Sequence, residues 1–166
     1  MSSVRIVKSK MNVLGTNISN TSNSLNNLIT LLQGITESTS KLISSPTDKL
    51  ISDLKTFREG LRGLYNITRV ELDVFFQDYN STCNKVLNMI EPLIVDLQKL
   101  KLTSKTLYLL YLIDIAMGGF LKYNLSEEDL KKHIPMIRRF LNEIKILKEK
   151  TIYNNNKLII KNNRGW

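Results

Sequence analysis

The chain holds few residues of the types that carry out covalent or metal chemistry. It has one histidine, His133, and one cysteine, Cys83, which fall on different predicted helices. Nucleophilic triads and common zinc sites need several such residues close together, so neither forms a site alone. The carboxylates Glu71, Asp73 and Asp78 stand among cations on an amphipathic segment, which is typical of a solvated helix face. The sequence therefore predicts a protein that is not an enzyme, with no catalytic residues, no metal ligands and no cofactor.

Cations are the residues that the sequence does supply in a pattern. The formal net charge is +9, the pI is near 9.7, and most of the excess falls after Lys101. Lysine and arginine at helical spacing neutralise nucleic-acid phosphates without reading bases. The predicted nucleic-acid-binding face consists of Lys131, Lys132, Arg138, Arg139, Lys145 and Lys148. Two other roles stay open for these cations, namely contact with anionic lipid headgroups and a solvated surface that only maintains solubility.

The charge is distributed unevenly along the rest of the chain. Residues 11–40 carry one charged residue, Glu37, and residues 41–100 hold equal numbers of acids and bases. A smaller basic group stands near the N-terminus, at Arg5, Lys8 and Lys10. The basic character is thus regional, as expected of a binding face.

Helices must position these side chains, and the first is predicted from Met11 to Leu42. Apolar residues and threonines recur there at alternating three- and four-residue spacing, the pattern of an amphipathic helix or a coiled coil. The opposite face is Asn, Ser and Thr, which are mediocre helix formers, so the helix needs partners that cover its seam. An intramolecular bundle is the favoured partner and a second copy is the alternative. The predicted core or assembly seam includes Leu25, Leu28, Leu32 and Ile35.

The most apolar stretch runs from Thr106 to Phe120 and carries Asp114 at its centre. A membrane helix needs about 20 apolar residues, and this run is shorter and bounded by lysines, so it is not predicted to span a bilayer. Because apolar residues surround nearly the whole circumference, we expect a central helix packed by its neighbours, or a helix shared with another subunit. Leu110 and Ile113 represent this core or interface.

The segment from Leu50 to Leu100 repeats the three- and four-residue spacing and is too long for a usual globular helix. We expect a break near Tyr65–Thr68 and a kink or restart at Pro92. Cys83 falls on the apolar seam, where a small buried hydrophobe is expected.

A capped helix is predicted to follow from Ser126 to Lys150, with Pro135 bending or dividing it. Its expected buried face is Leu130, Ile134, Ile137, Leu141 and Ile144. Residues 151–166 form a basic, Asn-rich tail, which suits a short hairpin, with a disordered tail as the alternative. The predicted organisation is one helical domain at 1–150 followed by this tail.

These features predict an all-α bundle of four to five helices that acts by assembly and binds nucleic-acid backbone through its basic C-terminal third. The richness in Asn, Ile, Lys and Tyr is typical of an AT-rich genome, and small helical coat proteins and small subunits of nucleoprotein complexes share this general composition. The expected partners are nucleic acid, bound without sequence specificity, and further copies of the chain or subunits of a larger complex. The expected location is the cytoplasm or a virion. A peripheral membrane protein and a protein-interaction subunit without nucleic acid are the alternatives.

Overall fold

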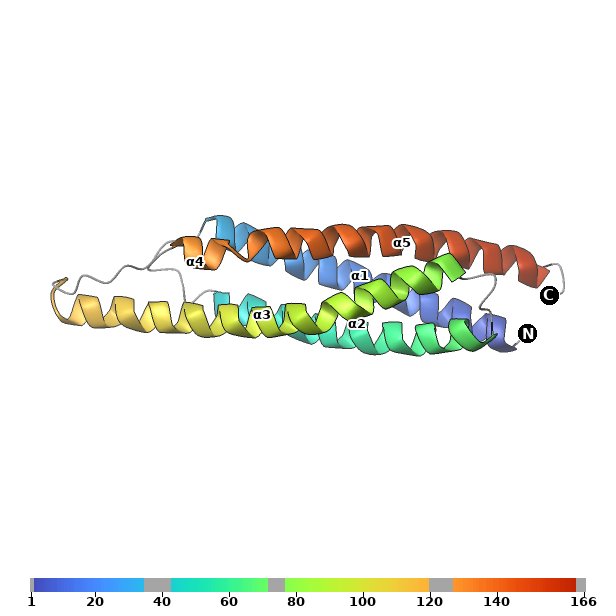
Figure 1. Cartoon of the computed structure of the whole chain (residues 1–166), viewed down its shortest axis with the longest axis horizontal. Helices are drawn as coiled ribbons and strands as arrows, with labels where there is room; N and C mark the ends of the chain where they lie inside the picture. Colours follow the sequence, from blue (N-terminus) through green and yellow to red (C-terminus); the bar gives the residue numbers. More distant parts are fainter. Residues whose placement is uncertain (1, 35–42, 72–76, 120–126, 164–166) are drawn as a thin grey trace.

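The computed structural model describes residues 2–34, 43–71, 77–119 and 127–163, and the regular structure in these ranges is helical. The helices are α1 (Ser2–Gln33), α2 (Ser44–Glu71), α3 (Gln77–Ala116), α4 (Glu127–Lys131) and α5 (Ile134–Asn163). Helices α1, α2, α3 and α5 are long and run alternately up and down (Figure 1), with α4 as a short helix before α5. Helix α1 packs against α2 and α5, and α3 packs against the same two helices. This confirms the predicted all-α bundle.

Each long helix faces the core with residues spaced alternately by three and four. On α1 the repeat consists of Val7, Met11, Leu14, Ile18, Thr21, Leu25, Leu28 and Leu32, and Ser24 and Ile29 are buried beside it. The same alternation continues from Ile43 to Leu64, from Tyr79 to Leu107 and from Ile137 to Asn154. A 3.5-residue period keeps one stripe of each helix turned toward its neighbours, which is how helices of a bundle interlock.

Ion pairs between neighbouring helices show their register. Between α2 and α3, Asp48 binds Lys101 at 2.7 Å, and ten residues further along α2 Arg58 binds Glu91, ten residues back along α3. Between α3 and α5, Asp78 pairs with Lys150 and Lys85 with Glu143, each at 3.0 Å. Exposed pairs of this kind contribute little to stability. In each helix pair, however, the residue number rises along one helix by as much as it falls along the other, which identifies antiparallel packing.

The seam of α1 lies inside the bundle. Leu25, Leu28 and Leu32 are fully buried, while Ile35 lies outside the described residues. Beside them Ser24 donates a hydrogen bond to Asp53 of α2, and Lys49 binds the same carboxylate at 3.0 Å. These three leucines therefore belong to the core of the bundle, as the favoured intramolecular interpretation expects, because α2 and α5 cover that face of α1.

Cys83 occupies the position expected for it, fully buried on the seam of α3. Burial raises the pKa of its thiol to about 12, so the thiol stays protonated at neutral pH. One turn away, the hydroxyl of Tyr79 lies 2.8 Å from Oγ1 of Thr151 on α5. Burial likewise raises the pKa of Tyr79, so this contact is between two neutral hydroxyl groups.

Two of the expected helix interruptions are found and one is not. Pro92 lies inside α3, and Figure 1 shows that this helix changes direction along its length. Pro135 falls in the first turn of α5, where proline is tolerated, and it follows the division between α4 and α5. The break expected near Tyr65–Thr68 is wrong, because α2 continues to Glu71.

The hairpin and the disordered tail expected after Lys150 are both wrong, because α5 continues as a helix to Asn163. Thr151 and Asn154 are buried and extend the seam of Ile144 and Leu147. The amide of Asn154 donates to the backbone oxygen of Lys150 at 2.7 Å, within the same helix. Contact with α1 and α3 overrides the strand preference of the β-branched residues here.

The expectation that residues 106–120 form a central, packed helix is also wrong. Since Asp48 lies opposite Lys101, the start of α2 is level with about Lys105, yet α3 continues to Ala116. Leu110 is 37% exposed and Ile113 is 48% exposed. Figure 1 shows this end of α3 extending past the other helices. We call residues 108–117 the overhang; Phe120 lies outside the described residues.

Two glycines follow the overhang. Gly118 and Gly119 have φ values of 75° and 79°, which favour glycine, and the N–H of Gly119 donates to the backbone oxygen of Asp114 at 2.8 Å. Among the described residues, Oδ1 of Asp114 has no hydrogen-bond partner although it is buried. No helix in the described ranges is long and apolar enough to cross a membrane.

Candidate nucleic-acid interface

Positive charge is concentrated on two neighbouring helices. Helix α1 contains three Lys or Arg residues and no acid, and α5 contains seven against two acids. Helix α2 holds five cations and four acids, and α3 holds four of each. Because α1 and α5 pack side by side, the excess of positive charge gathers on one side of the bundle.

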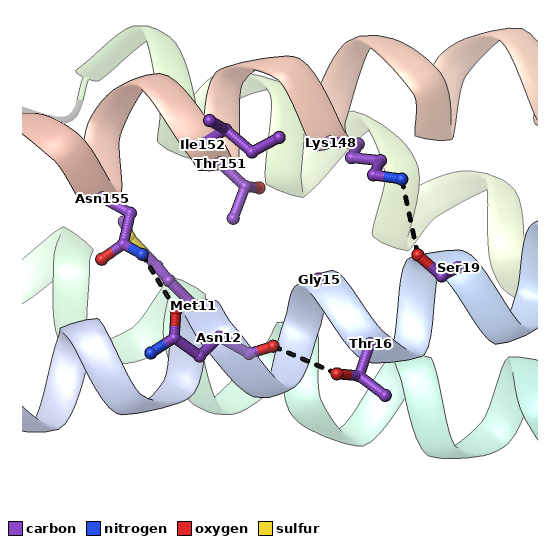
Figure 2. Close-up of a pocket in the computed structure, with 9 residues that line it drawn as sticks. All are labelled: Met11, Asn12, Gly15, Thr16, Ser19, Lys148, Thr151, Ile152 and Asn155. Atoms are coloured by element: carbon purple, nitrogen blue, oxygen red, sulfur yellow. Dashed lines mark hydrogen bonds between the residues drawn. The ribbon is translucent and has the colours of Figure 1, made fainter.

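The register between α1 and α5 follows from two contacts. Asn155 donates a hydrogen bond to Asn12 at 2.9 Å, and one heptad back along α5 Lys148 lies 3.4 Å from Oγ of Ser19. Figure 2 shows both contacts bridging a groove of about 380 Å³ between the two helices. A Cβ atom at Gly15 would meet nothing within 4 Å, so no side chain fills the groove there. Lys148 is the charged residue of its lining.

Two of the six predicted cations form the outer surface of α5. Arg138 and Lys145 are both exposed and stand one heptad apart, about 10 Å along the helix axis. Lys132 is exposed in the turn between α4 and α5. Lys131, the last residue of α4, is half-buried.

The other two predicted cations turn to the flanks of α5. Arg139 lines a second groove, of about 320 Å³, in which Asp96 of α3 also lies. Lys148 lies on the opposite flank, toward α1. The six cations therefore cover the exposed half of α4 and α5 and do not form one flat face.

In the sequence, the basic N-terminal group lies far from the residues of this surface. The structure brings it near, because Asn12 lies opposite Asn155 and α1 is antiparallel to α5, so Lys8 and Arg5 fall beside the last turns of α5. Both side chains are exposed. Lys10 is directed toward Gly63 of α2 instead. The proximity of Arg5 and Lys8 to α5 could have been predicted from an up-and-down topology, in which the first and last helices are neighbours.

Most of the predicted cations are not neutralised by acids of the bundle. Within the part of the chain that the structure describes, no ion pair holds Lys132, Arg138, Arg139, Lys145 or Lys148. Of the two acids on α5, Glu143 pairs with Lys85 of α3. Lys150 differs from the predicted set, because it is bound to Asp78 and to Thr82 at 2.9 Å. The unpaired cations remain accessible to an external polyanion.

The expected buried face of the last helix is partly correct. Leu130, Ile137 and Ile144 are buried, whereas Ile134 and Leu141 pack at its edge. Phe140 and Leu147 complete the face. In the described ranges no three His, Cys, Asp or Glu side chains gather as metal ligands.

His133 is half-buried beside Lys132, and its environment predicts that the stability of the bundle depends on pH. Burial lowers the pKa of His133 from its usual 6.5, the Lys132 ammonium lowers it further, and Asp96 opposes both. The unfolded chain therefore binds this proton more readily than the folded one. The free energy of unfolding should fall as the pH drops below about 6.5, and the contribution of His133 should be constant above it. Urea unfolding of the wild type and of His133→Gln on either side of that pH checks this, since equal slopes in both proteins would contradict it.

Comparison with protein-family models, with curated proteins and with solved structures finds no match to this chain. A functional assignment therefore depends on the geometry and charge described above.

Proposed function

We propose that this protein binds the backbone of nucleic acid along the side formed by α5 and the start of α1, without reading base sequence and without catalysing a reaction. The observation that supports the proposal is the concentration of cations on these two adjacent helices, while α2 has an excess of only one cation and α3 has none. Such a role fits a coat-like protein or a small subunit of a nucleoprotein complex, in the cytoplasm or in a virion.

The dimensions of the basic side suit a run of phosphates. Helix α5 has 30 residues and is therefore about 45 Å long. Duplex DNA presents one negative charge per ~1.7 Å of its axis, so many phosphates lie within reach of a helix of this length. Mobile lysine and arginine side chains then replace condensed counterions, whose release favours binding.

Among the described residues of α1 and α5, one exposed aromatic side chain is available to stack on bases. Tyr153 is an exposed aromatic residue of α5, and Nζ of Lys157 lies 4.5 Å from the centre of its ring. Specific recognition relies on side chains that contact base edges in a groove, or on aromatic rings that stack on unpaired bases. Contact with phosphates is therefore the interaction that this surface favours.

The test is a titration of short duplexes and single strands of several sequences at increasing salt. The variant reverses two charges on the outer surface, Arg138→Glu with Lys145→Glu. Binding to every oligonucleotide should weaken alike, and the slope of log K against log salt should flatten by roughly one unit for each phosphate that the variant no longer binds. Helix content should be unchanged, because both side chains are exposed.

A matched control is present on the balanced side of the bundle. Lys55 and Arg62 of α2 are also exposed and one heptad apart, so Lys55→Glu with Arg62→Glu changes the net charge equally. Equal losses of affinity from both pairs would mean diffuse attraction and would contradict a defined face. Absence of binding near physiological salt, together with binding to vesicles of anionic lipid, would favour the membrane-surface alternative.

A further inference from the structure

Helix α3 carries a second repeating stripe on the side that faces away from the bundle. Its members are Val95, Leu102, Thr106, Leu109, Ile113 and Ala116, which we call the outer α3 stripe. All six are exposed, Leu102 to 66%. Val95, Leu102, Leu109 and Ala116 recur at intervals of seven, and Lys99 completes the alternation of three and four. This is the spacing with which helices pack on helices, and a single lysine within such a seam is a known means of setting register.

The overhang leaves the far half of this stripe without a neighbouring helix among the described residues. The exposed apolar side chains of this half are Leu109, Ile113 and, one turn beyond Ile113, Met117. With Val95 and Leu102 they present on the order of 500 Å² of apolar surface, which is near the upper end of the range for the largest apolar patch on a monomer. Two copies that covered this surface mutually would bury about 1,000 Å², the lower limit for a specific interface.

We propose that two copies of this chain pair antiparallel through the outer α3 stripe. The stripe is complementary to itself under a two-fold axis that passes between Lys105 and Thr106. Leu102 then lies against Leu109 of the second copy, and Val95 lies against Ala116 of the second copy, and each contact occurs twice. Antiparallel pairing also places each overhang along the body of the other α3, whereas parallel pairing would leave both overhangs beyond the two bundles.

The charges beside the stripe make the dimer distinguishable from binding to a polyanion. Lys105 is exposed next to the proposed axis, so the two copies of this lysine repel each other, and each chain carries a net charge of +9. Salt screens this repulsion and should strengthen the dimer. Binding to nucleic acid or to anionic lipid should weaken under the same change, because those contacts join opposite charges.

Sedimentation equilibrium of the full chain, without nucleic acid, tests the proposal separately from the proposed function. The mass of the wild type should rise to about twice 19.1 kDa as its concentration increases. In higher salt this dimer should form at a lower protein concentration. Leu102→Lys with Leu109→Lys should remain at 19.1 kDa with unchanged helix content. The matched control is Ile146→Lys with Tyr153→Lys, two exposed apolar residues one heptad apart on α5, and it should still dimerise.

Disulfide trapping tests the antiparallel geometry. A cysteine at the axis meets its own copy, so Thr106→Cys should give a covalent dimer on mild oxidation. Val95→Cys should not, because the two copies of that position lie about 30 Å apart along the axis. Cys83 does not interfere, since it is fully buried. Equal trapping of both variants would overturn the antiparallel arrangement.

A wild type that stays at 19.1 kDa at every concentration would overturn the dimer. The same holds if this monomer instead binds neutral phosphatidylcholine vesicles.

Discussion

Replacing both Leu25 and Leu32 with lysine is expected to unfold the bundle. Both leucines are fully buried where α1 meets α2 and α5, so the variant would place two unpaired ammonium groups in an apolar core. An unpaired buried charge costs at least several kcal/mol, and a whole domain is stable by only about 5–15 kcal/mol. The helical circular dichroism signal should therefore be lost at room temperature.

The control for this variant is on the same helix. Val13 is 56% exposed and Asn20 is exposed, and they are one heptad apart, as Leu25 and Leu32 are. Val13→Lys with Asn20→Lys should keep its helical signal, because both lysines reach water. If the Leu25 and Leu32 variant instead kept its helices and changed only its mass in sedimentation, the seam would be a contact between subunits and not part of the core.

The second large effect is expected at Phe140. Its side chain is almost fully buried, and its ring centre lies 6.5 Å from that of Phe57, which joins α5 to α2 across the core. Phe140→Ala should lower the free energy of unfolding by about 3–5 kcal/mol, since the bundle refills only part of the space left by the ring. Urea titration followed by circular dichroism measures this decrease.

Ile146 serves as the comparison, because it lies on the same helix and is 43% exposed. Ile146→Ala should change the free energy of unfolding by no more than about 0.5 kcal/mol. Similar decreases at the two positions would mean that Phe140 does not lie in a closely packed core.

Helices with a local apolar repeat were predictable from the sequence. The seam of α1 from Met11 to Leu32 and the position of Cys83 were correct, because alternate spacing of three and four already defines a buried stripe. The packing of the stretch around Leu110 was predicted wrongly, because its exposure does not depend on a local pattern. Apolar composition indicates that a helix prefers to be covered, but whether it is covered depends on where the neighbouring helices end.

The tail was misjudged because local preference and tertiary contact disagree there. The β-branched residues near Thr151 favour a strand in isolation, yet the seam of Ile144 and Leu147 continues through Thr151 and Asn154. Because these two residues are polar, the repeat cannot be recognised from the spacing of apolar side chains alone. Their hydroxyl and amide groups bond to backbone oxygens one turn back, which lets them occupy core positions.

The sequence predicted which cations of α4 and α5 are available to the candidate interface. It did not predict the directions in which their side chains point, or the contribution of α1. Arg138 and Lys145 share a direction because seven residues are two helical turns. The different directions of Arg139 and Lys148 depend on which helix lies on each flank of α5. The addition of Lys8 from α1 requires the topology of the whole bundle, which no local pattern contains.

The up-and-down order of the helices also has a consequence for how the basic side is built during folding. Ser24 and Asp53, which join α1 to α2, are 29 residues apart in the chain, whereas Asn12 and Asn155, which join α1 to α5, are 143 apart. Closing the longer loop in an unfolded chain costs roughly 1.4 kcal/mol more conformational entropy. Helical hairpins formed from neighbouring segments shorten that loop, so α1 meets α5 most readily after the hairpins exist. We therefore expect the surface that gathers the cations to be completed late in folding.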